Sequence, residues 1–181
     1  MSGVYPVYHL TWNTDLGPLT ALATQRGLAR LWLSQPDLEG QARRLAGRAA
    51  WELRDEPLPV LSQTRQQVDE YLIGQRKEFD LALDLRGTPF QMSVWQALQT
   101  VAWGRVVTYG QLAAMVSRPG AARAVGQANG ANPIPIIVPC HRVVAVGGLG
   151  GYGSGLANKR VLLGLEGVTA ADVRRAGQAG P

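Results

Sequence analysis

The sequence is poor in the residues that build disulfides and metal sites: it contains one cysteine, Cys140, and two histidines. A single cysteine forms neither an internal disulfide nor a multi-cysteine zinc site, so we expect a free thiol, no bound metal and a reducing compartment, the cytoplasm. No apolar run approaches the roughly 18 residues of a membrane helix, which excludes a spanning protein. The first residues lack a basic start followed by an apolar stretch, so we expect no secretory signal.

Acidic residues are scarce in the second half of the chain. Residues 1–88 hold ten basic and eleven acidic side chains, whereas residues 89–181 hold eight basic and only two acidic ones. The second half therefore has a net charge of +6 and is the candidate surface for a polyanion, although a solvated basic face gives the same composition. With 46% hydrophobic residues over 181 positions, the chain is long enough for a packed core.

Turn residues near position 88 divide the chain into two lobes, which we place at residues 1–88 and 89–168. In the first lobe, alternating apolar residues and turn signals predict strands and helices. The strands are expected at residues 4–12, 19–24, 28–33 and 51–54, and the helices at 36–48 and 60–73. This lobe has no recognisable catalytic constellation, and we interpret it as a scaffold. The small, polar tail at residues 169–181 is expected to be flexible.

The second lobe begins with helical periodicity, and helices are predicted at residues 90–101, 109–116 and 121–129. A short turn joins the last two, as in a helix-turn-helix, although an ordinary helical pair has the same pattern. The outward face of the third helix carries small residues and few long side chains. Its members are Ala122, Arg123, Gly126 and Gln127. Such a smooth face favours recognition of DNA shape or of a lesion over reading of base sequence.

Cys140 comes after a proline-rich, apolar segment and directly before His141. We expect residues 136–138 to form a buried strand that delivers both side chains to its end. A free thiol has a pKa of about 8.5, so a nucleophilic cysteine needs a base. His141 is the only histidine of the second half, and Glu166 is one of two carboxylates there. These residues predict a Cys–His–Glu relay, connected through a water or a sharp turn.

Simpler interpretations of the same three residues stay open: an inert buried thiol, a histidine satisfied in the core and a surface carboxylate. The glycine-rich segment at residues 147–155 has spacings similar to a dinucleotide-binding loop. It lacks the preceding strand and the following acidic residue that such a loop requires. We interpret it as a loop that lines a pocket for a flat ring, because glycines allow close approach of the backbone.

At these positions the sequence resembles the O6-alkylguanine-DNA alkyltransferase family, the methylated-DNA–protein-cysteine methyltransferases. The resemblance spans residues 89–167 and rests on four motifs. They are PCHRVV at 139–144, Asn-Pro at 132–133, ARAVG at 122–126 and Leu-Glu-Gly at 165–167. The resemblance implies an α+β fold. It consists of a small N-terminal sheet-plus-helix lobe, ribonuclease H-like, and a mainly helical C-terminal lobe with a helix-turn-helix.

The resemblance also implies catalytic roles for matching residues. Cys140 would accept the alkyl group, with His141 as its base through water and Glu166 orienting His141. Asn132 would brace the turn that carries the thiol. Tyr109 would push on the phosphate of a flipped nucleotide and help to protonate the leaving guanine.

Contacts to DNA and to the base follow from the same resemblance. Arg123 would fill the gap that the flipped base leaves, and Ala122, Gly126 and Gln127 would lie against the DNA. Six further residues would form the substrate pocket, namely Val143, Val144, Tyr152, Gly153, Ser154 and Lys159. No zinc is expected in the first lobe, which has no cysteine and one histidine.

Taken together, the resemblance implies a DNA repair protein that flips O6-alkylguanine out of double-stranded DNA. It would transfer the alkyl group irreversibly to Cys140, once per chain, as a monomer and without a cofactor; O4-alkylthymine is a further substrate that stays open. Three alternatives remain: a module that binds lesions without chemistry, a helix-turn-helix transcription factor and a cysteine hydrolase. The presence of Cys140 argues against the first, the smooth helix face argues against the second, and the third predicts repeated turnover.

Overall fold

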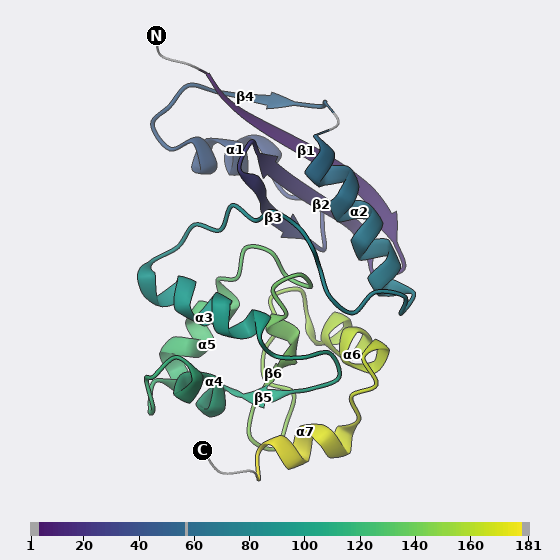
Figure 1. Cartoon of the computed structure of the whole chain (residues 1–181), viewed down its shortest axis with the longest axis vertical. Helices are drawn as coiled ribbons and strands as arrows, with labels where there is room; N and C mark the ends of the chain where they lie inside the picture. Colours follow the sequence, from purple (N-terminus) through teal and green to yellow (C-terminus); the bar gives the residue numbers. More distant parts are fainter. Residues whose placement is uncertain (1–3, 57, 179–181) are drawn as a thin grey trace. The chain divides into compact units, whose positions relative to one another are not determined.

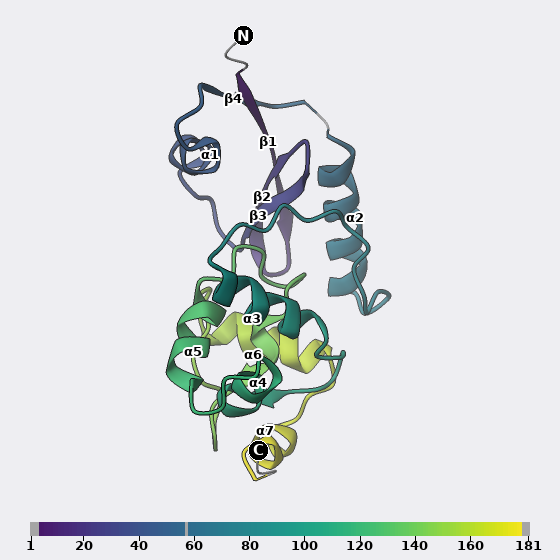
Figure 2. The same ribbon diagram turned by 60° about the vertical axis from the view of Figure 1, so that its left-hand side comes forward.

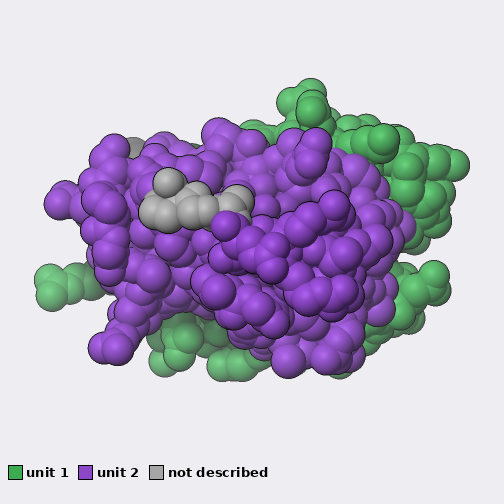
Figure 3. All heavy atoms as spheres, turned by 90° about the horizontal axis from the view of Figure 1, so that it is seen from below, with its two compact units in different colours: residues 1–85 green, residues 86–181 purple. Residues whose placement is uncertain are grey.

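The computed structural model describes residues 4–56 and 58–178. The chain divides into two compact units, residues 1–85 and 86–181, whereas the turn residues indicate a boundary at 88. Figure 1 labels the helices and strands, and Figure 3 colours the two units separately. Among the described residues, no helix has the length and apolar character needed to cross a membrane.

The N-terminal unit is built on a four-stranded sheet with the order β3-β2-β1-β4. β1 (Tyr5–Thr14), β2 (Gly17–Thr24) and β3 (Gly27–Trp32) form an antiparallel meander. β4 (Trp51–Arg54) pairs parallel with β1. All four strands lie where the alternation of apolar residues predicts them.

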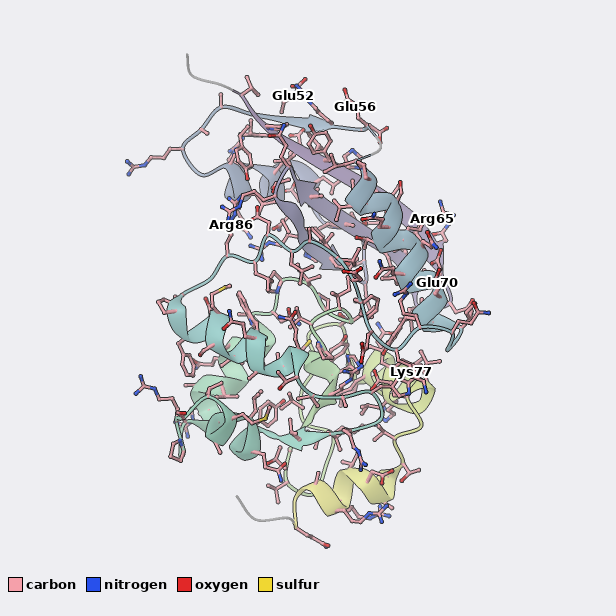
Figure 4. All side chains as sticks on the ribbon, in the orientation of Figure 1. Glu52, Glu56, Arg65, Glu70, Lys77 and Arg86 are labelled. Atoms are coloured by element: carbon pink, nitrogen blue, oxygen red, sulfur yellow. The ribbon has the colours of Figure 1, made fainter. Side chains whose placement is uncertain are left out.

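Helices cover both faces of this sheet, as Figure 2 shows. They are α1 (Leu38–Ala46) and α2 (Pro59–Leu72). Successive residues of a strand face opposite sides, so Val7 of β1 packs with Ala42 of α1. On the other face, Trp12 donates its Nε1–H to Asp69 of α2 at 3.0 Å. The exposed Arg65 of α2 points away from the sheet (Figure 4). Each face of the sheet is thus packed against one helix, and the role of this unit as a scaffold stays a prediction.

The C-terminal unit is mainly helical, as expected. Its helices are α3 (Pro89–Gln99), α4 (Tyr109–Met115), α5 (Ala122–Gly130), α6 (Leu156–Leu165) and α7 (Ala170–Ala176). Two short strands, β5 (Val107–Thr108) and β6 (Val143–Val144), pair in parallel within this unit. The turn at residues 116–121 connects α4 to α5. Capping boxes start α3 and α4 and satisfy the first backbone N–H groups of each helix.

The tail differs from the sequence-based expectation of a flexible segment at residues 169–181. Residues 170–176 form α7, and a capping box fixes its first turn. Thr169 accepts the N–H of Asp172 at 3.2 Å, while the Asp172 carboxylate accepts the Thr169 N–H at 2.8 Å. Val173 is buried against the rest of the unit. The structure therefore has a helix at residues 170–176, where the composition predicts a flexible tail. Residues 179–181 lie outside the described part.

The segment before the cysteine also differs from its predicted form. Residues 136–138 are buried, as expected, but they form turns in place of a strand. Ile136 has a φ of 73°, in the left-handed region that no regular strand contains. The Val138 N–H donates to the Ile134 carbonyl at 2.9 Å, which closes the turn. A short 3-10 helix, Cys140–Arg142, follows and leads directly into β6.

Candidate active site

The turn that carries Cys140 is held by one amide side chain, that of Asn132. Its Oδ1 accepts the N–H of Ile134 at 3.0 Å, and its Nδ2 donates to the Val138 carbonyl at 2.7 Å. The Cys140 N–H donates to the same Val138 carbonyl at 2.8 Å. The left-handed backbone conformation of Ile136 within the turn costs free energy. The two hydrogen bonds of the Asn132 amide, one to each side of the turn, offset this cost. Asn132 occupies the bracing position implied by the resemblance.

The thiol of Cys140 is largely withdrawn from water, with 5% of the residue exposed. Burial raises the pKa of Cys140 to about 11, because a thiolate is poorly solvated there. A hydrogen bond from the Asn132 side chain and the charge of Lys159 act in the opposite direction. The resting group is therefore a neutral thiol at pH 7, and it reacts as a nucleophile only when a base takes its proton.

A buried histidine–carboxylate pair lies directly beside the thiol in the chain. His141 Nε2 and Glu166 Oε1 are 2.8 Å apart, and both side chains are fully buried. Burial lowers the pKa of His141, while the hydrogen bond to Glu166 raises it. The imidazole is thus neutral in the resting state and can accept a proton, after which the carboxylate stabilises the imidazolium.

Arg142 is a site residue that the sequence analysis missed. Its Nε donates to Glu166 Oε2 at 2.9 Å and its Nη2 to Glu166 Oε1 at 2.9 Å, a two-pronged contact. Its Nη1 donates to the Val101 carbonyl, and the Gly104 N–H donates to Glu166 Oε2 at 3.2 Å. The sequence contains one signal for the Arg142–Glu166 pair. Residues 89–181 include only two acidic side chains, so an arginine there that is buried has few possible partners.

Lys159 fastens the glycine-rich loop to β6. Its side chain is fully buried, and its Nζ donates to the carbonyls of Val143 at 2.6 Å, Leu149 at 2.5 Å and Gly151 at 3.1 Å. Burial lowers the pKa of Lys159 to about 8. All three hydrogens of the ammonium group have backbone acceptors, so the lysine positions the loop beside the thiol.

Two tyrosines line the same region. Burial raises the pKa of Tyr109, and a hydrogen bond from the Gly151 backbone acts in the opposite direction. The Tyr109 ring lies against Gly126 of α5 and against Gly150, which has a φ of 69°. The Tyr152 ring packs edge-on to His141, with centroids 6.5 Å apart. Its buried hydroxyl has no hydrogen-bond partner among the described residues, so it is available to a bound molecule.

Helix α5 presents one exposed face and one face that reaches the cysteine turn. Arg123 and Gln127 are exposed, whereas Ala122 and Gly126 are partly buried. On its inner face, Asn129 is buried and its Nδ2 lies 3.4 Å from the Cys140 carbonyl. Asn129 is a second residue that the sequence analysis missed.

The predicted residues fall into two groups. Contacts within the site connect seven of them: Tyr109, Asn132, Cys140, His141, Tyr152, Lys159 and Glu166. Val143 and Val144 are buried in β6 next to this group. Arg123, Gln127 and Gly153 are exposed, and Ser154 accepts a hydrogen bond from Asn158 through its carbonyl. The structure thus separates a buried reaction centre from an exposed helix face.

Comparisons with known proteins show which family the chain belongs to. Residues 6–85 match the model of the 6-O-methylguanine DNA methyltransferase ribonuclease-like domain, and residues 89–168 match the DNA binding domain of the same family. A methylated-DNA–protein-cysteine methyltransferase of Mycobacterium tuberculosis H37Rv is 43% identical over 162 residues, covering 88% of this chain and 92% of its own. A constitutive one of Bacillus subtilis is 42% identical over 161 residues, covering 88% and 94%.

Solved structures give the same result. Mycobacterium tuberculosis OGT in complex with DNA has a TM-score of 0.75 at 40% identity, over 90% of this chain and 96% of that one. An O6-methylguanine-DNA methyltransferase of Pyrococcus kodakaraensis has a TM-score of 0.65 at 30% identity, over 90% and 99%. The chain belongs to the 6-O-methylguanine DNA methyltransferase family. The family and the α+β fold predicted from the sequence are confirmed.

The hydrogen bonds between Arg142 and Glu166 predict that replacing Glu166 with glutamine, which has nearly the same shape, strongly lowers the stability of the protein. Glu166→Gln removes the charge that compensates buried Arg142, so we expect the free energy of unfolding to fall by about 3–5 kcal/mol. Chemical denaturation followed by circular dichroism measures this. The control is Glu52→Gln, whose partner Arg54 is exposed, and it should change little. Equal small losses in both variants would contradict a structural role of the Glu166 carboxylate.

The raised pKa of Cys140 predicts how its reactivity depends on pH. In the folded protein, alkylation by iodoacetamide should accelerate about tenfold per pH unit from pH 7 to 10, because the thiolate fraction grows at that rate below the pKa. The same chain unfolded in urea should level off near the pKa of a free cysteine, about 8.5. Mass spectrometry at each pH follows the only thiol of the sequence. A plateau near pH 8.5 in the folded protein would show that burial does not control this thiol.

Proposed function

We propose that this protein repairs O6-alkylguanine in double-stranded DNA by moving the alkyl group onto Cys140, once per chain. The observation that carries the proposal is the buried His141–Glu166 pair, whose histidine directly follows the sole cysteine in the chain. The family membership supports it, as does the relative whose structure was solved in complex with DNA.

The chemistry is a displacement at the alkyl carbon. His141 takes the thiol proton through a water molecule, and Glu166 stabilises the resulting imidazolium. The sulfur then attacks the alkyl carbon, a C–S bond forms, and the C–O bond breaks with its electron pair moving to the guanine oxygen. Tyr109 stays protonated at rest because its pKa is raised, and it supplies a proton to the leaving guanine. Its phenolate then regains a proton from water, while the His141 imidazolium releases the thiol proton to water, so that one proton in total moves from the thiol to the guanine. The thioether product stays on Cys140, which accounts for a single turnover.

The alkyl group on O6 lies inside the duplex, so the base must first leave the stack. Extrusion costs a few kcal/mol, and less for a damaged base that pairs poorly. We propose that α4 and α5 act as a helix-turn-helix whose smooth face, with Ala122 and Gly126, approaches the DNA groove closely. Arg123 then fills the gap that the extruded base leaves, and Gln127 lies alongside it.

The extruded base enters the pocket between β6 and the glycine-rich loop. Val143 and Val144 supply backbone groups for its edge, and Tyr152 with Gly153 and Ser154 closes over it. Lys159 fixes the loop through three carbonyls, so the loop is held beside β6 before the base arrives. The unpartnered Tyr152 hydroxyl becomes satisfied when the base is bound. The protein needs no cofactor for this reaction and acts as a monomer.

Intact-mass spectrometry tests the transfer directly. After mixing with duplex DNA that contains one O6-methylguanine, the chain should gain the mass of one methylene group, located on Cys140 and limited to one per chain. Cys140→Ser should bind the same DNA with unchanged affinity and gain nothing. Unchanged mass in the natural sequence with retained binding would support a lesion-binding module, and release of product over many cycles would support a hydrolase.

Arg123→Ala separates extrusion from chemistry. We expect transfer from duplex DNA to slow by at least about tenfold, because part of the unstacking cost is no longer offset. Transfer from the free base O6-methylguanine needs no extrusion and should keep its rate. Gln127→Ala, on the same exposed face, is the matched control and should affect duplex transfer less. An equal loss with duplex and free base would assign Arg123 to the chemical step and overturn the extrusion role.

A further inference from the structure

A cavity of about 320 Å³ lies within the C-terminal unit, between the glycine-rich loop, α6 and α7. Its apolar walls include Leu149 of the loop, Leu163 of α6 and Val173 of α7. Arg160 and Arg174 are at its border. The cavity is separate from the thiol, and α7 lies beyond residue 168, where the family match ends.

The two arginines of this cavity have no acidic partner in the part of the chain that the structure describes. Both are exposed, and neither forms an ion pair or a side-chain hydrogen bond with any described residue. No acidic residue lines the cavity. The carboxylate of the nearby Asp172 is already engaged by Thr169 and by Arg175. Two guanidinium groups beside an apolar wall thus present positive charge that no anion among residues 4–56 and 58–178 neutralises.

We propose that this cavity binds a small organic anion with an apolar body. Its volume lies at the lower end of the range for small-molecule sites, which are mostly apolar with a few polar groups that fix orientation. Arginine forms charge-assisted, two-pronged contacts with carboxylate, sulfonate or phosphate groups. Arg160 and Arg174 hold the anionic group, and Leu149, Leu163 and Val173 contact the apolar body.

Occupancy of this cavity restrains the loop that borders the active site. Leu149 lines the cavity, and its carbonyl accepts a hydrogen bond from Lys159. The end of α7 is packed closely on the start of the loop, since a Cβ at Gly177 would lie 3.1 Å from Val146. A ligand between α6 and α7 therefore fills the space behind the loop and limits its motion.

The test uses 1-anilinonaphthalene-8-sulfonate, an apolar anion whose fluorescence rises on binding, and the neutral N-phenyl-1-naphthylamine. The natural sequence should bind the anionic probe at one saturable site. The double variant Arg160→Gln, Arg174→Gln should bind it at least about tenfold more weakly and keep its affinity for the neutral probe. The double variant Arg44→Gln, Arg48→Gln changes two exposed arginines of the N-terminal unit and should leave both affinities unchanged.

A second variant and a second measurement locate the site. Ala170→Trp fills the cavity and should abolish binding of both probes, with circular dichroism to confirm the fold. In the natural sequence, the anionic probe should slow amide hydrogen exchange at residues 147–151. The proposal is overturned if binding is not saturable, if the Arg160 and Arg174 double variant binds the anionic probe as tightly as the natural sequence, or if exchange in the loop is unchanged at saturation.

Discussion

The buried carboxylate of Glu166 holds the reaction centre together. It accepts hydrogen bonds from Arg142 and Gly104 and is paired with His141, so two segments far from Glu166 in the sequence, at 104 and at 141–142, converge on its two oxygen atoms. A buried carboxylate needs one compensating charge, and Arg142 supplies it. The histidine can therefore remain neutral at rest, which a base must be. The same carboxylate is available when His141 becomes charged during the reaction.

Burial protects the Cys140 thiol from reagents in solution, because it keeps the thiol protonated. For the same reason the thiol needs the His141–Glu166 pair to remove its proton. With a pKa of about 11, Cys140 exists almost entirely as the neutral thiol at pH 7. Oxidants and soluble alkylating agents react with thiolates, so they find little of the reactive form. Asn132 keeps the sulfur at a fixed position in its turn, and Lys159 keeps the loop beside it. A protein with one usable thiol gains from a nucleophile that is activated only within its own site.

The sequence predicts most of the fold because its signals are local. Alternation and turn signals place the four strands, helical periodicity places α3 and α4, and the scarcity of acidic residues singles out Glu166. The misses have physical reasons. A short apolar run at 136–138 fits a strand as well as a buried turn, and only the bridge made by Asn132 decides for the turn. Helix α7 was missed although Thr169 and Asp172 have capping-box spacing, because the tail was judged by composition. Arg142 and Asn129 owe their roles to tertiary contacts.

The wide spacing of the site along the chain has a consequence for biosynthesis. Cys140 precedes Lys159 and Glu166 in the chain, and until the C-terminal unit folds around it, it is an ordinary exposed cysteine with a pKa near 8.5. At pH 7 such a thiol is ionised far more often than the folded one. The unfolded polypeptide is therefore more vulnerable to modification of this thiol than the folded protein, and packing of α6 against the cysteine turn ends that exposure. Rapid folding of the C-terminal unit therefore both assembles the site and keeps the Cys140 thiol unmodified.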